Sequence, residues 1–460
     1  LDANTTGADN TAVGVSALRQ NTASNNTAVG RAALTANTTG ASNTAVGSGA
    51  LGANTTASSN TAVGQLALNA NTTGYESTAI GVNASLATTT GRQNVVIGFN
   101  SFQANTIGKE NVIIGHNAGY SSTEADENTF VGQSAGYFTT TGEKNTFIGR
   151  KAGQLNTTAA NNTFIGHKAA DANTTGTANS AVGTDALGAN TTGAYNTAVG
   201  RAALLNNTTA SYNTAVGMDS MAANTTGTQQ TAVGNEALQS NTTGAENTAF
   251  GYQALKLCTT GTTNSGIGKQ SLRSLTTGTG NTALGIHAGY GITTGSNNLT
   301  LGQDAGRSNS PSGNITTGSN NVCLGDNSIS NLFCADTSIS SSDSRDKTDV
   351  ADFSIGLAWI NALRPVTYKW DRRTWYGTEA EPFGTPDGSK KRSKTHIGFL
   401  AQEALDVEKA NGYGSSNDDS LVVNLTEDGM SYGMKYERLV PILVNAIKEL
   451  SAKVTALEAG

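Results

Sequence analysis

Ser342 and Lys347 are the residues whose types and spacing suit covalent chemistry, and they bound the hexapeptide SDSRDK. A serine hydroxyl becomes a nucleophile when a base takes its proton. Lysine can be that base only where desolvation or neighbouring cations lower its pKa well below about 10. Arg345 could supply such a cation. The hexapeptide alone fits a helix cap better, because Asp343 or Ser344 would be a preferred N-cap residue.

The composition of the chain changes at this hexapeptide. The 341 residues before it carry 29 charged side chains, and the 119 residues from Ser342 onward carry 33. All three tryptophans and four of the five prolines lie in the second part. The change predicts a boundary between two structurally different parts.

The net charge of −6 is mild and spread along the chain, which argues against a nucleic-acid-binding surface. The sequence has no run of about 18 apolar residues, so we expect no membrane span. Because Leu1 falls inside a repeat, we expect the natural chain to begin earlier, with any targeting or attachment segment in that region.

Residues 1–306 form a tandem repeat that predicts a β-solenoid. The unit reads NTAVGxxALxxNTTGxx, and its first glycine recurs every 17 residues from Gly30 through Gly302. A fixed period this short is typical of solenoids, in which neighbouring units stabilise each other. The glycine, asparagine and threonine content disfavours helices. We therefore expect a parallel β-solenoid with one 17-residue coil per layer.

Short apolar segments such as Thr27-Ala28-Val29 predict strands of three or four residues. The residue just before the first glycine, here Val29, is always apolar, and we predict that it points into the coil. The leucine four residues after that glycine, here Leu34, should form the opposing wall. Such a thin core favours association of several chains. The residue two before the glycine, here Ala28, is our candidate for the face between chains.

The Asn-Thr-Thr segments allow three interpretations. Asn4, Asn37, Asn54 and Asn71 each begin a glycosylation sequon. Stacked threonines could instead bind ice, or stacked Asn and Thr side chains could form hydrogen-bonded ladders at the corners of the coil. We favour the ladders, because adjacent threonines point to opposite faces, whereas ice binding favours alternating threonines on one flat face.

The repeats contain no recurring histidine or acidic pair that would suit a metal site or a glycosidase. We therefore predict no metal and no cofactor. Cys258, Cys323 and Cys334 lack a CxxC spacing. We interpret them as substituted repeat positions rather than as disulfide or metal-binding cysteines.

Residues 307–341 are expected to form an irregular closing coil and a serine-rich linker. In the second part, the apolar spacing predicts helices at 355–363 and 402–410 and strands at 366–370, 396–401, 421–425 and 431–436. The last element predicted is a helix with a heptad seam typical of coiled coils, which indicates oligomerisation. The seam residues are Val440, Leu443, Ile447, Leu450, Val454 and Leu457.

Several motifs of the second part occur in an order that resembles the S74 peptidase family. They are SDSRDK at 342–347, LRPVTY at 363–368, HIGFLAQE at 396–403 and the terminal coiled coil. Members of this family are C-terminal intramolecular chaperone domains of phage tailspikes and tail fibres. The repeats, in turn, resemble the β-roll heads of trimeric autotransporter adhesins.

The S74 resemblance implies a homotrimer whose terminal domain templates fibre folding and then cuts itself off. It implies that Ser342 is the nucleophile and Lys347 the general base. The single cut in cis would fall beside Ser342, most simply at the Ser341–Ser342 bond. Such a self-cleaving serine endopeptidase needs no turnover on external substrates. His396 is a weaker candidate, which we expect to pack at a strand end.

The expected protein is mainly β: a trimeric parallel β-solenoid fibre followed by a small α+β chaperone domain that ends in a coiled-coil helix. The expected domains are 1–306, 307–341, 342–435 and 436–460. We expect a viral, phage-type tail fibre or tailspike on the virion, made in the host cytoplasm. Its expected partners are a host surface receptor or glycan and other tail components. The alternative is a trimeric surface adhesin or stalk with an uncleaved trimerisation cap.

Overall fold

The structure, a computed structural model, describes residues 2–329, 347–378, 381, 383–425 and 431–459. The chain divides into two compact units, Leu1–Ile286 and His287–Gly460. The first unit is a repetitive β structure. The second contains two further strands of the repeat type and an α+β part.

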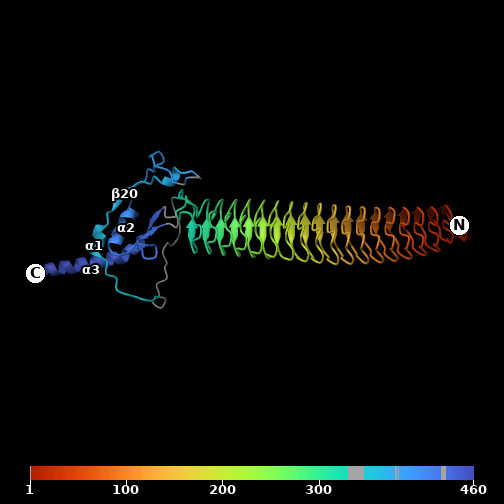
Figure 1. The fold of residues 1–460 in the computed structure, drawn as a ribbon, viewed down its shortest axis with the longest axis horizontal. Helices are drawn as coiled ribbons and strands as arrows, with labels where there is room; N and C mark the ends of the chain where they lie inside the picture. Colours follow the sequence, from red (N-terminus) through yellow and green to blue (C-terminus); the bar gives the residue numbers. More distant parts are fainter. Residues whose placement is uncertain (1, 330–346, 379–380, 382, 426–430, 460) are drawn as a thin grey trace. The chain divides into compact units, whose positions relative to one another are not determined.

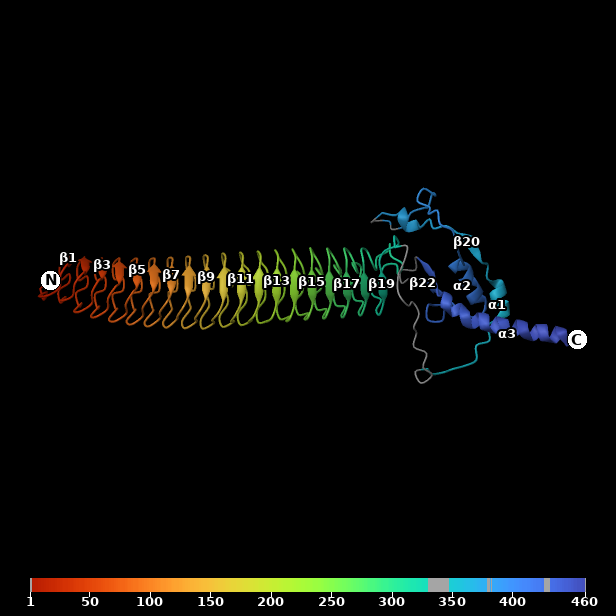
Figure 2. The same cartoon turned by 180° about the vertical axis from the view of Figure 1, so that it is seen from behind.

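The first unit is a parallel β-solenoid with one three-residue strand per coil (Figures 1 and 2). From β2 onward, paired residues of successive strands lie 17 positions apart, as in Thr27↔Thr44, which confirms the predicted period. The strands are β1 (Thr11–Val13), β2 (Thr27–Val29), β3 (Thr44–Val46), β4 (Thr61–Val63), β5 (Thr78–Ile80), β6 (Val95–Ile97), β7 (Val112–Ile114), β8 (Thr129–Val131), β9 (Thr146–Ile148), β10 (Thr163–Ile165), β11 (Ser180–Val182), β12 (Thr197–Val199), β13 (Thr214–Val216), β14 (Thr231–Val233), β15 (Thr248–Phe250), β16 (Ser265–Ile267) and β17 (Thr282–Leu284).

The middle residue of each strand points into the coil, and the last residue points outward. Ala28 and Phe147 are fully buried, whereas Val46 and Ile148 are 36% and 38% exposed. The prediction that the residue before the glycine lines the core is therefore wrong, and so is the assignment of the residue two before it to an outer face. Side chains alternate along a strand. When both positions are apolar, sequence alone does not fix which of them faces inward.

The leucine four residues after the glycine is buried, as predicted; Leu34 and Leu51 are both fully buried. The coils whose inward strand residue is Ile113 or a phenylalanine carry glycine or alanine at this position. A Cβ on Gly153 would lie 2.7 Å from the ring of Phe147. Because the interior is close-packed, a phenylalanine on the strand leaves room only for a small residue at this position of the same coil.

The first glycine of each unit is required by both conformation and space. Gly149 has a φ of +136°, which L side chains rarely adopt, and a Cβ built there would lie 2.3 Å from the carbonyl oxygen of Gly166 in the next coil. The strict 17-residue glycine period therefore reflects the close approach of successive coils.

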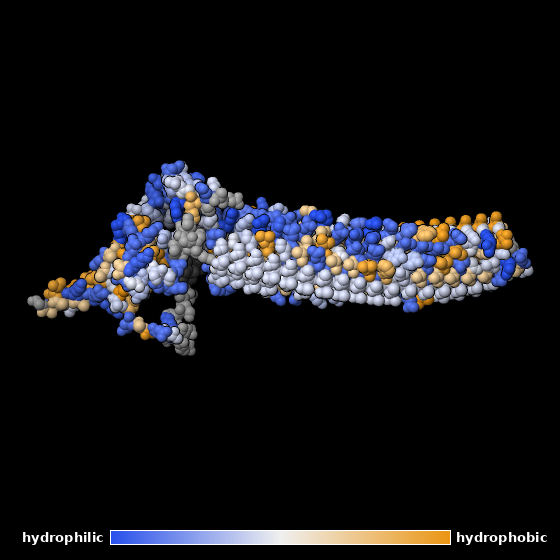
Figure 3. Space-filling view, in the orientation of Figure 1, coloured by the Kyte–Doolittle hydropathy of each residue, from blue (hydrophilic) through white to orange (hydrophobic). Residues whose placement is uncertain are grey.

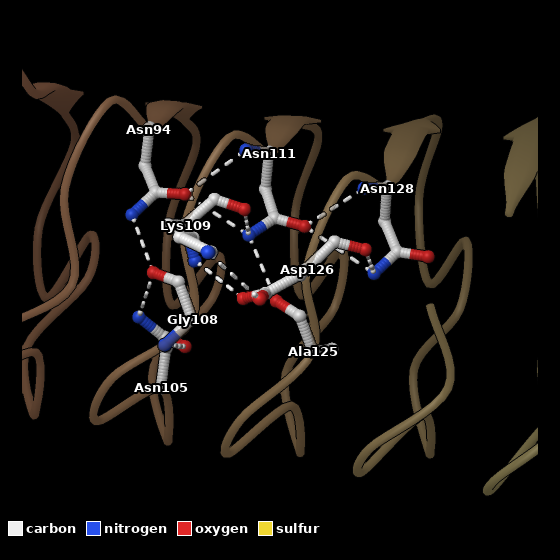
Figure 4. Close-up of polar contacts among 8 residues, drawn as sticks. All are labelled: Asn94, Asn105, Gly108, Lys109, Asn111, Ala125, Asp126 and Asn128. Atoms are coloured by element: carbon white, nitrogen blue, oxygen red, sulfur yellow. Dashed lines mark hydrogen bonds and ion pairs between the residues drawn. The ribbon is translucent and has the colours of Figure 1, made fainter. Parts of the chain in front are cut away.

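Asparagine side chains link neighbouring coils in a ladder that follows the strands (Figure 4). The backbone N–H of Asn111 donates to Asn94 Oδ1 at 3.0 Å, and that of Asn128 donates to Asn111 Oδ1 at 2.9 Å. Asn94 Nδ2 donates in turn to the Gly108 carbonyl at 2.8 Å. At the corner before the strand, each asparagine amide therefore provides the hydrogen-bond partner that another backbone group would otherwise provide.

A second ladder uses the asparagines of the Asn-Thr-Thr segments. Asn54 Nδ2 donates to Asn37 Oδ1 at 2.7 Å, and Asn71 Nδ2 donates to Asn54 Oδ1 at 2.9 Å. The next residue continues the pattern, because Thr38 Oγ1 donates to the Thr55 carbonyl at 3.0 Å. Asn37, Asn54 and Asn71 are buried, and their amide nitrogens are in use. The ladder interpretation is therefore confirmed, and the folded coil leaves no room for a glycan on these amides.

The second unit begins with two strands of the repeat type, β18 (Leu299–Leu301) and β19 (Val322–Leu324). They pair in parallel with a spacing of 23 residues, as in Leu299↔Val322. The extra residues form the turn that contains Pro311. The last described coil is therefore longer than the 17-residue unit.

The α+β part contains most of the predicted elements. They are α1 (Leu357–Ala362), β20 (Val366–Tyr368), η2 (Arg373–Trp375), β21 (His396–Gly398), α2 (Ala401–Ala410), β22 (Val423–Leu425), β23 (Tyr432–Met434), η3 (Tyr436–Arg438) and α3 (Leu439–Glu458). β20 pairs with β21, and β22 pairs with β23, both antiparallel. α1 ends before Pro365, because a residue that precedes proline disfavours helical angles.

Candidate functional site

The proposed dyad straddles the edge of the described residues. Ser341 and Ser342 lie outside them. Lys347 is the first described residue that follows, and it is exposed. Ten residues later, α1 begins at Leu357. The described part of the site is therefore the scaffold that follows the lysine.

Helix α3 holds the segment that leads from Lys347 into α1. The Leu357 N–H donates to Glu449 Oε2 at 3.2 Å, and Asn445 Nδ2 donates to the Ile355 carbonyl at 3.3 Å. Both acceptor and donor side chains come from α3. The helix with the heptad seam thus also anchors the peptide just beyond the candidate base.

A compact apolar core connects these elements. Trp359 of α1, Ala404 of α2, and Leu439 and Ile442 of α3 belong to one buried cluster that also contains Val422 and Val423. Burial of each leucine, isoleucine or valine side chain in it contributes about 1.5–3 kcal/mol. The core joins residues from all three helices, so the segment after Lys347 is placed by a folded domain.

Glu408 is a buried carboxylate that the sequence did not reveal. It lies near the end of α2 and is fully buried. Its Oε1 accepts from the backbone N–H groups of Val422 (2.6 Å) and Val423 (2.9 Å), and its Oε2 accepts from Ser420 Oγ (2.8 Å) and the Leu421 N–H (3.1 Å). Four donors on one carboxylate compensate its desolvation. Glu408 therefore fastens α2 to the segment that enters β22.

Tyr436 makes a similar connection from η3 to the motif at 396–403. The backbone N–H of Phe399 donates to its hydroxyl at 3.1 Å. A Cβ on Gly398 would lie 2.5 Å from the same oxygen. The glycine of the HIGFLAQE motif is thus explained by the close approach of Tyr436.

His396 is half-buried in an aromatic cluster at the start of β21. Its ring stacks on Tyr368 with 5.6 Å between centroids, and Trp370 lies edge-on at 6.2 Å. The guanidinium of Arg372 covers Trp370 at 4.3 Å. Burial, together with nearby Tyr436, raises the pKa of Tyr368. These contacts agree with the expectation that His396 packs at a strand end.

Helix α3 has two apolar faces with different environments. Leu439, Ile442 and Ala446 are buried against the domain. The predicted seam residues are instead 42% to 82% exposed, with Leu443 the least and Leu457 the most exposed among them. The seam is therefore not used within the single chain.

The described residues contain no group of three or more His, Cys, Asp or Glu side chains placed to bind a metal ion. None of the helices in the described ranges is long and apolar enough to cross a membrane. Cys258 and Cys323 are buried free thiols at repeat positions, as predicted, and Cys334 lies outside the described residues.

Comparison with known proteins identifies the segment that follows the linker. Residues 342–413 match the family model Peptidase_S74, described as chaperone of endosialidase. No curated protein and no solved structure matches the chain. The matched residues begin at the proposed nucleophile and include α1, β20, β21 and α2. The chain thus joins a 17-residue-repeat parallel β-solenoid to a segment that matches the Peptidase_S74 family of endosialidase chaperones.

Proposed function

We propose that the chain is a phage-type tail fibre or tailspike protein whose C-terminal part promotes folding of a trimeric β-solenoid and then releases itself. The observation that carries the proposal is the order of the parts. A long solenoid ends just before a Peptidase_S74 match that starts at Ser342, and an exposed heptad seam follows. On this proposal the fibre belongs to the virion, and it contacts a host receptor or glycan.

The proposed cleavage is a single acyl transfer followed by hydrolysis. Ser342 Oγ adds to the Ser341 carbonyl while Lys347 takes the hydroxyl proton. The C–N bond between Ser341 and Ser342 breaks, the proton passes to the leaving amine, and an ester remains. One water then hydrolyses the ester, which leaves a carboxylate at Ser341 and an amino terminus at Ser342.

The exposure of Lys347 suggests when this step occurs. A lysine base requires desolvation or nearby cations, and Lys347 is exposed in the single chain. We propose that association of the chains covers this region, so that cleavage follows assembly.

Substitution of the dyad tests the proposed cleavage. Ser342→Ala and Lys347→Ala should remain full length on a denaturing gel while still assembling, whereas Ser344→Ala should be cut like the parent chain. Lys347→Arg should also remain intact, because it keeps the charge without supplying a base at neutral pH. Mass spectrometry of the parent should find a terminus at Ser342.

Cleavage of the Ser342→Ala or Lys347→Ala chain at the parent rate would contradict the dyad. An intact parent chain that still forms trimers would instead support the surface adhesin or stalk, in which the exposed seam of α3 acts only as a trimerisation cap.

A further inference from the structure

The solenoid carries one outward position that is apolar in every coil. This position is the last residue of each strand from β1 to β17, called the apolar column here. Its members are valine, isoleucine, phenylalanine or leucine, and none of them is buried. Exposure is 51% at Leu284 and 55% at Phe250, and it reaches 57% at Val13.

Repetition within the chain makes this regularity informative. Each coil presents the same structural position once. The residue that follows the glycine also lies outside, yet it varies from Arg31 through Gln65 and Phe99 to His116. The apolar column contains no polar residue in seventeen coils. Scattered exposed apolar residues need no explanation, but a continuous row of them is typical of an interface.

The space-filling view agrees with rows of apolar surface on the solenoid. In Figure 3, orange residues recur at regular intervals along one edge of the solenoid near its N-terminal end. The interior offers little compensation for this exposure, because the inward strand residue is alanine in most coils. Burial of an outer apolar row would therefore add substantially to a thin core.

We propose that the apolar column is the face along which copies of this chain pack against each other, parallel and in register. The inference rests on the proposed trimeric fibre and names its contact surface. A column with one residue per coil repeats at about 4.8 Å, the spacing of neighbouring strands. A second copy of the chain presents a row with the same repeat over the same number of coils. A globular partner has no such repeat.

The C-terminal helix also favours a second copy of the chain as the partner of the apolar column. The α3 seam is a second exposed apolar row in the same polypeptide, with the heptad spacing by which helices associate. Parallel association through this seam would bring equivalent chains together. The same symmetry would place equivalent coils of the chains at the same level along the fibre.

Site-directed cross-linking tests the proposed face. The starting chain carries Ser342→Ala to keep it intact and Cys258→Asn, Cys323→Ala and Cys334→Ser to remove its own thiols. Ile148→Cys then places a thiol in the apolar column. The matched control, Thr158→Cys, places a thiol at an exposed position elsewhere in the same coil.

After oxidation, the Ile148→Cys chain should give mostly covalent dimers on a non-reducing denaturing gel, at least about tenfold more than Thr158→Cys. Light scattering should give the mass of three chains for both variants. A three-chain mass without the excess at Ile148→Cys would overturn the proposed face and leave the trimer standing. A single-chain mass would overturn the trimer itself and with it the inference.

Discussion

At the scale of the residue, Cys258 shows what one position of a ladder contributes. It occupies the place of the Asn-Thr-Thr asparagine, one coil after Asn241. Its Sγ donates to the Gly261 carbonyl oxygen at 3.6 Å, and Asn241 Oδ1 accepts from Gln230 Nε2 at 3.2 Å rather than from an amide at position 258. A thiol fills the volume of the amide but makes weaker hydrogen bonds. The ladder is therefore interrupted while the coil stays closed.

Burial raises the pKa of the Cys258 thiol to about 11. Because an unfolded cysteine titrates near 8.5, the stability that the neutral buried thiol contributes is fully present below about pH 8.5 and is lost as the pH rises through about 11. In a Cys323→Ala, Cys334→Ser chain at pH 8, a thiol reagent should therefore modify Cys258 at least about 100-fold more slowly in the native state than in denaturant. Equal rates, followed by the absorbance of the released thiolate, would contradict this prediction.

At the scale of the element, Glu408 joins α2 to the segment that enters β22 through hydrogen bonds. Its replacement by glutamine places an amide N–H₂ against backbone N–H donors and removes the charge that strengthens the remaining bonds. Glu408→Gln should therefore destabilise the α+β part by about 2–4 kcal/mol.

Urea unfolding followed by tryptophan fluorescence measures this change selectively, because all three tryptophans lie after residue 342. Glu403→Gln is the matched control on the same helix. Glu403 pairs with Arg364 but is exposed, so its loss should shift the midpoint little. If the two variants unfold at the same urea concentration, the four hydrogen bonds to Glu408 do not contribute the expected stability.

Sequence periodicity predicted the elements well but not their inward faces. The 17-residue glycine period identified the solenoid because Gly149 and its equivalents meet the next coil directly. The inward position was missed, because Ala28 and Val29 are both apolar and only the twist of the coil decides between them. Glu408 was missed for a different reason. Three of its four donors are the backbone N–H groups of Leu421, Val422 and Val423, and backbone donors cannot be recognised from residue types.

The predicted helices and strands of the second part were found within a few residues. Pro365 fixed the end of α1, and the heptad spacing fixed the seam of α3. The Ser342–Lys347 dyad remains a prediction from resemblance, because Ser342 lies outside the described residues. Only the exposure of Lys347 was added by the structure.

At the scale of the whole molecule, the chain combines two kinds of order. In the solenoid each strand pairs with the strand of the coil before it and of the coil after it, as Thr44 does with Thr27 and Thr61. In the α+β part, one core unites helices that are up to about 80 residues apart in sequence. The first kind of order propagates from neighbour to neighbour, whereas the second forms as a unit.

Because successive coils pair in the same way, the first unit should lengthen under force in equal steps. Each coil stores 17 residues within about 4.8 Å, and these residues span up to about 58 Å when stretched. An optical trap attached at residues 23 and 279 of the Ser342→Ala chain should therefore record successive length increments of about 50 Å, all nearly equal. A single large extension would instead show that the coils yield together. Equal increments would mean that a pulled fibre lengthens in small, countable steps and dissipates work at each one.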